Sequence, residues 1–158
     1  MDSFTHIDDE GRVRMVDVTD KPGTLRTARA RGVVTMQRDT FDKIKNQQVK
    51  KGNVLETARI AGVMAAKKTA DLIPMCHPLN LSHVAVDFFP DVDASAIVVE
   101  ATARLTGQTG VEMEALTAVS VAALTIYDMC KSYDRGMTII RIELVEKAGG
   151  KSGTFKKQ

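Results

Sequence analysis

An acid and a base stand three residues apart near the end of a long apolar segment, at Asp128 and Lys131. On a helix, this spacing puts the two side chains about 60° apart around the axis and about 4.5 Å apart along it. Such an ion pair on a surface stabilises a fold by less than about 1 kcal/mol. In a partly dry setting, each charge would instead hold its partner ionised, as a reactive site requires. Spacing alone leaves both interpretations open.

A second candidate is the thiol and imidazole pair Cys76 and His77, which lies between Pro74 and Pro78. Proline fixes φ and lacks a backbone N–H, so this stretch is neither regular helix nor central strand. A rigid loop that presents these two side chains at a helix end is typical of part of a site. Adjacent side chains seldom point at each other, so we expect no Cys–His nucleophile pair. We predict instead that His77 donates a hydrogen bond to a phosphate or a carbonyl.

Two carboxylates, Glu112 and Glu114, open the apolar segment that ends near Asp128. The helix dipole stabilises carboxylates in a first turn, and an ordinary helix start accounts well for Glu112. Glu114 and Asp128 point to nearly the same side of a helix but lie about 21 Å apart along it. No single reactive atom can touch both. Either the ligand is long, or the two helix ends serve sites that different subunits complete.

Metal and nucleotide-loop motifs are weak in this chain. Zinc sites need three or four ligands, usually in spaced pairs. The sequence offers three histidines and two cysteines without that spacing, so we predict no metal site.

Residues 149–152 resemble the end of a P-loop, but Val145 stands where its first glycine belongs and too few residues follow for a helix. We expect a loose arm that can fold over phosphates.

The composition predicts one domain with an aliphatic core. The chain has 158 residues, of which 44% are hydrophobic, and a net charge of +2. Its positive charges form local clusters, which favours a phosphorylated small molecule over a nucleic acid. Two cysteines and no secretory segment predict a cytoplasmic protein with free thiols. The apolar run 115–126 is interrupted by hydroxyl residues and is too short to span a membrane.

Periodicity and turn signals place the elements. We expect strands at 26–36, 81–89, 96–105 and 138–146, and helices at 39–46, 53–70 and 111–132. Asn53 precedes Glu56 by three residues, as in a capping box. The long elements run β-α-β-β-α-β, which predicts an α+β, ferredoxin-like split βαβ sandwich. Its antiparallel sheet would carry two long helices on one face. Residues 1–22 and 148–158 are expected to be flexible ends around a domain at 23–147.

The helix expected at 111–132 is apolar nearly all round, so it must bury more than one face. One sheet covers only one side of it. We therefore predict a subunit interface on the remaining side and an oligomeric protein.

Several segments together resemble one family, the MoaC family of cyclic pyranopterin monophosphate synthases, which act early in molybdenum cofactor biosynthesis. The segments that carry the resemblance are residues 15–18, 51–54, 58–62, 71–79, 105–107, 113–118 and 126–131. They occur in order along nearly the whole chain, with no large insertion. Residues 132–136 are the least distinctive part and receive no role.

The resemblance implies a phosphorus–oxygen lyase that converts (8S)-3′,8-cyclo-7,8-dihydroguanosine 5′-triphosphate to cyclic pyranopterin monophosphate and releases pyrophosphate. It also implies a homohexamer, a trimer of dimers, with active sites at subunit interfaces. By position, Asp128 corresponds to the catalytic acid/base, with Lys51 and Lys131 as its cationic partners. Taken alone, Lys51 would be interpreted as a solvated lysine. The substrate-binding segments correspond to Met75, Cys76, His77, Met113 and Glu114.

The side-chain chemistry agrees with this reaction. Opening one ring and closing another needs repeated proton transfers, hence an Asp/Lys pair. Forming a cyclic phosphate expels pyrophosphate and needs nearby positive charge. Besides His77, we expect this charge from Lys21, Arg26, Lys147 and Lys151. Glu114 is expected to accept hydrogen bonds from guanine-derived N–H groups. No cofactor is predicted, although Mg²⁺ accompanying the triphosphate stays open.

The main alternative is a ferredoxin-like regulatory or RNA-binding module. RNA-recognition sheets stack bases on aromatic side chains of one face. Here the predicted strands offer only Phe88 and Phe89, which are adjacent and so lie on opposite faces. We therefore expect no nucleic-acid partner, and the short apolar run 115–126 predicts no membrane partner. An Asp128→Asn variant that binds ligand but loses turnover would separate an enzyme from a binding module.

Overall fold

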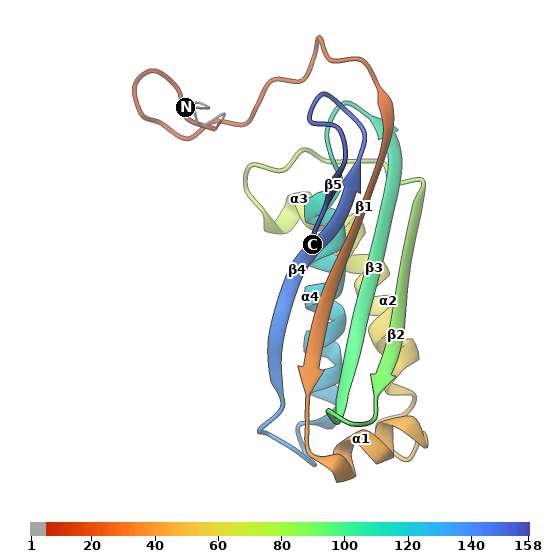
Figure 1. Ribbon diagram of the computed structural model, residues 1–158. Helices are drawn as coiled ribbons and strands as arrows, with labels where there is room; N and C mark the ends of the chain where they lie inside the picture. The colour runs from red at the N-terminus through yellow and green to blue at the C-terminus, as the bar shows by residue number, and fades with distance from the viewer. Residues whose placement is uncertain (1–5) are drawn as a thin grey trace.

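The computed structural model describes residues 6–158 and contains one sheet with helices packed on one of its faces (Figure 1). In chain order the elements are β1 (Thr24–Thr35), α1 (Arg38–Lys45), α2 (Val54–Lys67), α3 (Thr69–Leu72), β2 (His83–Asp91), β3 (Ala96–Gly107), α4 (Glu112–Cys130), β4 (Thr138–Ala148) and β5 (Phe155–Lys156). The predicted long strands and helices are confirmed. The helix predicted at 53–70 breaks at Lys68 into α2 and α3. Residues 1–5 of the expected flexible start lie outside the described residues.

The sheet has the strand order β2-β3-β1-β4-β5 and is antiparallel throughout. Its first four strands give the ferredoxin-like α+β arrangement that the sequence predicts, with β1 in the middle. The register between β1 and β4 shifts twice, between Arg29 and Ala30 and between Val33 and Val34. Such shifts bend and twist a strand locally.

Small side chains bring the helices close to each other and to the sheet. Alternate residues of β1, including Ala28 and Ala30, are buried beneath the helices. A Cβ added to Gly62 of α2 would lie 3.0 Å from the backbone oxygen of Ala118 in α4 and 3.1 Å from Val86 Cγ2 in β2. Glycine at this position therefore permits the close contact of α2 with α4. Asn53 caps α2 as predicted, its side chain accepting from the Glu56 N–H at 3.2 Å.

Helix α4 is the core helix of this fold. By length and composition alone it could cross a membrane, but half of it is buried inside the protein. The sheet covers one side and α2 a second side. A third side stays uncovered and exposes Met113 and Leu124, as α2 exposes Ile60 and Met64. These four side chains, called the uncovered apolar surface below, agree with the predicted need for a further partner of α4.

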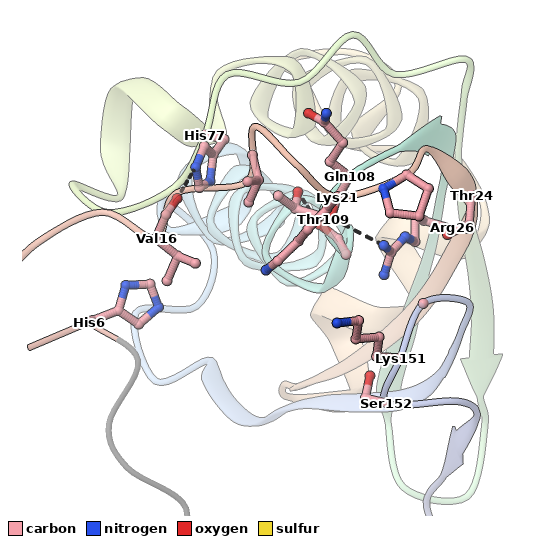
Figure 2. Close-up of a pocket in the computed structure, with 14 residues that line it drawn as sticks. His6, Val16, Lys21, Thr24, Arg26, His77, Gln108, Thr109, Lys151 and Ser152 are labelled. Carbon is pink, nitrogen blue, oxygen red and sulfur yellow. Dashed lines mark hydrogen bonds between the residues drawn. The ribbon is translucent and has the colours of Figure 1, made fainter.

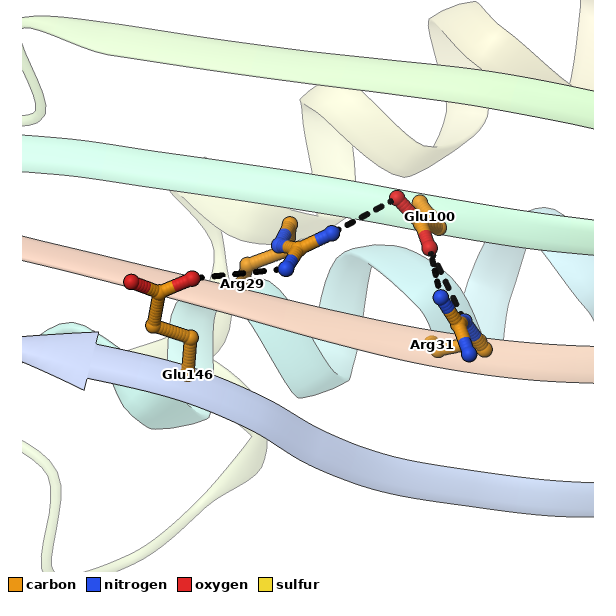
Figure 3. A network of polar contacts seen from close by, with 4 residues as sticks. All are labelled: Arg29, Arg31, Glu100 and Glu146. Carbon is orange, nitrogen blue, oxygen red and sulfur yellow. Dashed lines mark hydrogen bonds and ion pairs between the residues drawn. The ribbon is translucent and has the colours of Figure 1, made fainter. Parts of the chain in front are cut away.

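The outer face of the sheet, away from the helices, carries an ion-pair network (Figure 3). The Glu100 carboxylate on β3 accepts from Arg29 Nη1 at 3.3 Å and from Arg31 Nε at 2.8 Å. Arg29 also donates to Glu146 on β4 at 3.3 Å. The Glu100 side chain is only 16% exposed, whereas that of Glu146 is 37% exposed. The Glu100 carboxylate is therefore largely shielded from solvent, whereas its partners Arg29 and Arg31 are 34% and 39% exposed.

Replacing Glu100 by Gln should lower the free energy of unfolding by about 2 kcal/mol, because Arg31 loses its carboxylate partner in this network and Arg29 keeps only Glu146. Glu146→Gln is a matched control, since this more exposed carboxylate pairs with one arginine and should cost less than about 1 kcal/mol. Urea denaturation at fixed protein concentration measures both. Equal losses in the free energy of unfolding for the two variants would show that the burial of Glu100 does not strengthen its ion pairs.

The C-terminal segment turns back along the sheet. β4 continues through Ala148, and β5 pairs with its end at Glu146 and Lys147. The Lys157 N–H also donates to the Val145 oxygen at 2.9 Å. No strand was predicted in this segment. The mobility predicted for the two ends of the chain stays a prediction.

Candidate functional site

A cavity of about 640 Å³ lies beside the start of α4 (Figure 2). Four segments line it: part of the N-terminal segment with the start of β1, the loop at His77, the connection into α4, and the loop after β4. Four predicted binding residues meet there, namely Lys21, Arg26, His77 and Lys151. We call it the cationic cavity.

Arg26 joins three walls of the cationic cavity. Its Nε donates to the Gly107 oxygen at 3.3 Å, its Nη2 to the Gln108 oxygen at 3.1 Å and its Nη1 to the Gly149 oxygen at 3.4 Å. Gly150 lies against the guanidinium with φ of +77°, and a Cβ there would collide with Nη1. The backbone conformation therefore favours glycine at this position, and a side chain there would also displace the Arg26 guanidinium.

His77 links its loop to the N-terminal segment. Its Nε2 lies 2.7 Å from the Val16 oxygen. A carbonyl only accepts, so Nε2 carries the hydrogen and donates to the backbone of this chain. Val16 and Val18 both line the cavity, and Figure 2 shows Val16 beside His77. A role of His77 toward substrate stays a prediction.

Lys147 lies next to the cationic cavity and does not line it. Its Nζ is 2.9 Å from Glu112 Oε1 at the start of α4 and donates to Ser152 Oγ at 3.0 Å. In this structure Lys147 thus holds the loop after β4 against α4.

Glu114 is buried in the first turn of α4, outside the lining of the cavity. Burial raises the pKa of its carboxyl group to about 7, and the negative charge of Glu112 acts in the same direction. Burial, with the charge of Glu114, also raises the pKa of the Cys76 thiol. Cys76 is therefore a protonated thiol at neutral pH and a poor nucleophile.

Neither Met75 nor Met113, two of the predicted substrate-binding residues, lines the cavity, and Met113 is exposed.

The three predicted catalytic residues meet at the other end of α4. Lys131 Nζ lies 2.7 Å from Asp128 Oδ1, and Lys51 Nζ lies 3.8 Å from Oδ2. Lys51 also donates to the backbone oxygen of Asp128 at 2.9 Å. The hydrogen bond from Lys131, and then the charges of both lysines, lower the pKa of Asp128. We call these three residues the acid–lysine cluster. Within one chain the Asp128 and Lys131 side chains are 62% and 52% exposed, so they form an exposed ion pair, and the drier setting expected of a reactive site stays a prediction.

The cationic cavity and the acid–lysine cluster lie at opposite ends of α4. The cavity includes Gln108, Thr109 and Gly110, which lead into the helix, whereas Asp128 lies in its last turn. Along the axis, Glu114 and Asp128 are about 21 Å apart. One chain therefore does not bring its own two sets of residues together.

Several cavity residues were not predicted as binding residues from the sequence, among them His6, Thr24 and Gln108, whereas Ser152 belongs to the arm expected at 149–152 to fold over phosphates. Gln108 lies just before a long helix, which is the one signal that could have drawn attention to it. Nothing local marks His6 or Thr24. Within residues 6–158, no three or more His, Cys, Asp or Glu side chains gather closely enough to hold a metal ion.

A ferredoxin-like chain with a cationic cavity and a charged Asp–Lys cluster has the features expected of an enzyme for a phosphorylated small molecule. Residues 15–150 match the MoaC family model. The chain is 71% identical over 155 residues to a cyclic pyranopterin monophosphate synthase of Desulforapulum autotrophicum, covering 98% of this chain and 95% of that protein. Proteins of the same name from Desulfatibacillum aliphaticivorans and a Roseiflexus species are 64% and 61% identical, each covering 98% of both chains. The chain therefore belongs to the MoaC family, enzymes of molybdenum cofactor biosynthesis, which confirms the resemblance.

Proposed function

We propose that this chain converts 3′,8-cyclo-7,8-dihydroguanosine 5′-triphosphate to cyclic pyranopterin monophosphate and pyrophosphate at a site shared between two chains. One chain would supply the cationic cavity, and another would supply the acid–lysine cluster. The separation of these two sets along α4 is the observation that carries the proposal.

The uncovered apolar surface supports a shared site. Leu124 and Asp128 are four residues apart on α4, so they lie on the same side of the helix. The Leu124 and Asp128 side chains are both exposed in one chain. A second chain packed on this surface would bury Leu124 and bring Asp128 into the drier setting that proton transfer favours. We propose the homohexamer, a trimer of dimers, as the assembly that does this.

The cationic cavity is proposed to bind the triphosphate. Its volume of about 640 Å³ is within the usual range of small-molecule sites. Arg26 has three of its N–H groups committed to carbonyls, so it shapes the wall and adds charge from there. Lys21 and Lys151 are then the cations placed to stabilise the leaving pyrophosphate. Mg²⁺ is proposed to enter only as a companion of the triphosphate.

The acid–lysine cluster is proposed to move protons. Asp128 is ionised at neutral pH and can accept a proton first, while charged Lys131 at 2.7 Å can donate one. Lys51 holds positive charge on the other side of the carboxylate. Glu114, with a pKa of about 7, is present in both protonation states and can either donate to or accept from a guanine-derived group. Free thiols at Cys76 and Cys130 are consistent with a cytoplasmic location.

The test is pyrophosphate release and pterin formation from the cyclised nucleotide, measured for wild type, Asp128→Asn and Lys51→Ala. We expect both variants to lose at least about 100-fold in kcat while they still bind substrate, because proton transfer contributes this much. Asp42→Asn, which alters an exposed pair with Arg38 on α1, is the control and should keep full activity. Tight binding without turnover in wild type would instead indicate a ligand-binding protein. Repeating the assay with EDTA tests the Mg²⁺ proposal.

A further inference from the structure

The loop that carries Lys51 is tied to the end of α4 by the phenol of Tyr133. Tyr133 Oη accepts a hydrogen bond from the Lys50 N–H at 3.1 Å. Tyr133 itself belongs to the turn after α4, where its own N–H donates to the Cys130 oxygen at 2.9 Å. One side chain thus connects the loop of Lys51 to the helix end that bears Asp128.

The ring of Tyr133 is held in place from several sides. It is half-buried against the core, and Lys43 Nζ of α1 lies 5.7 Å from its centroid. The next residue, Asp134, is buried and accepts from the Gln37 N–H at 2.8 Å and from the Gly136 N–H at 2.9 Å. The turn after α4 is therefore a fixed support rather than a loose end.

Lys51 depends on such a support because its side chain is long and flexible. Before it, Val49 is buried in the core, and after it Asn53 begins α2. Between these points the Lys50 N–H donates to the Tyr133 phenol. The next residue, Lys51, donates from Nζ to the backbone oxygen of Asp128 at 2.9 Å. A loop that drifts away from α4 would move the ammonium group away from the carboxylate.

We propose that Tyr133 is a positioning residue, whose phenol fixes the place of the Lys51 ammonium group against Asp128. The inference rests on the proposed function, in which Lys51 and Asp128 act on the substrate. Tyr133 itself need not touch the substrate; it acts through Lys51.

The consequence for pH dependence follows from the charges around Asp128. Lys131 from its own helix and Lys51 from the facing loop both lower the pKa of Asp128. Loosening Lys51 removes part of this effect, so the pKa of Asp128 rises toward its ordinary value. The acid limb of the pH profile of kcat then moves to higher pH, because Asp128 must be ionised to accept a proton.

The experiment replaces Tyr133 by Phe, which keeps the ring and removes the hydrogen-bonding oxygen. We expect kcat to fall about tenfold with KM changed less than about twofold, and the acid limb to move to higher pH. Tyr127→Phe is the matched control. The Tyr127 phenol donates to the Arg135 oxygen at 3.2 Å, near the same end of α4, and has no bond to the Lys51 loop. Because Tyr127 also lies near Lys131, this control should keep kcat within about twofold, and it should leave the acid limb, which Asp128 sets, in place.

Two further measurements decide the outcome. In a Lys51→Ala background, Tyr133→Phe should have no additional effect on kcat, since the group it positions is gone. An equal fall in both backgrounds, or a lower Tm with unchanged kcat, would overturn the proposal. Carbon-13 NMR of the Asp128 carboxyl group gives a readout without turnover. A higher pKa of Asp128 in Tyr133→Phe supports positioning even if wild type proves inactive, and an unchanged pKa refutes it.

Discussion

An equimolar mixture of Asp128→Asn and His77→Ala chains, unfolded and refolded together, should recover about one quarter of wild-type turnover. Each variant alone should be inactive. A shared site needs an intact acid–lysine cluster from one chain and an intact cationic cavity from another. Random pairing supplies both in about one site of four. The physical basis is the separation of the two sets at opposite ends of α4.

The control mixes Asp128→Asn with Lys51→Ala. These residues belong to one acid–lysine cluster, so every cluster in the mixture is defective and no activity should return. Pyrophosphate release measures both mixtures, and size-exclusion chromatography confirms that each has reassembled. Failure of the first mixture to recover activity would place the whole site within one chain.

Glu114→Gln should stabilise the folded protein by about 3 kcal/mol at pH 8 and by much less at pH 5. Burial, aided by Glu112, raises the pKa of the Glu114 carboxyl group from 4.5 to about 7 in the folded state. Between these values the folded protein binds a proton that the unfolded chain has lost. In wild type, the contribution of Glu114 to the free energy of unfolding is thus fully present below pH 4.5 and is lost as the pH rises through about 7. Glutamine has no such proton to lose.

Urea denaturation at pH 5 and pH 8, at one protein concentration, tests this difference. Glu56→Gln is the control, because Glu56 is exposed on α2, where it pairs with Arg59 at 3.1 Å. The control should keep the wild-type loss of stability between the two pH values. If Glu114→Gln keeps it as well, the carboxyl group of Glu114 is already ionised at pH 5.

Local signals predicted most of the fold and one part of the site. Alternation and helix starts located the long elements, since burial on one face of a strand or helix leaves a period in the sequence. The contact of Lys131 with Asp128 follows from spacing on one helix. The contact of Lys51 with Asp128 does not follow from local spacing, because the tertiary fold brings the Lys51 loop to α4. Only the family resemblance indicated that Lys51 belongs with Asp128.

The rest depends on packing that no local pattern records. The cationic cavity brings together residues as distant in sequence as Val16 and Ser152. Glu114 had the pattern of an ordinary first-turn carboxylate, which the helix dipole would keep ionised. Its burial outweighs that effect and raises its pKa. β5 escaped prediction because two residues after a glycine-rich turn carry no strand period.

The two edges of the sheet differ, and both discourage aggregation. β2 has Pro90, which lacks an N–H, and the acidic residues Asp87 and Asp91. β4 departs twice from regular register with β1, and β5 covers its last residues. Free strand edges are templates on which further chains can add and grow into fibres. With these edges obstructed, the assembly proposed above, through the uncovered apolar surface, would be closed rather than open-ended.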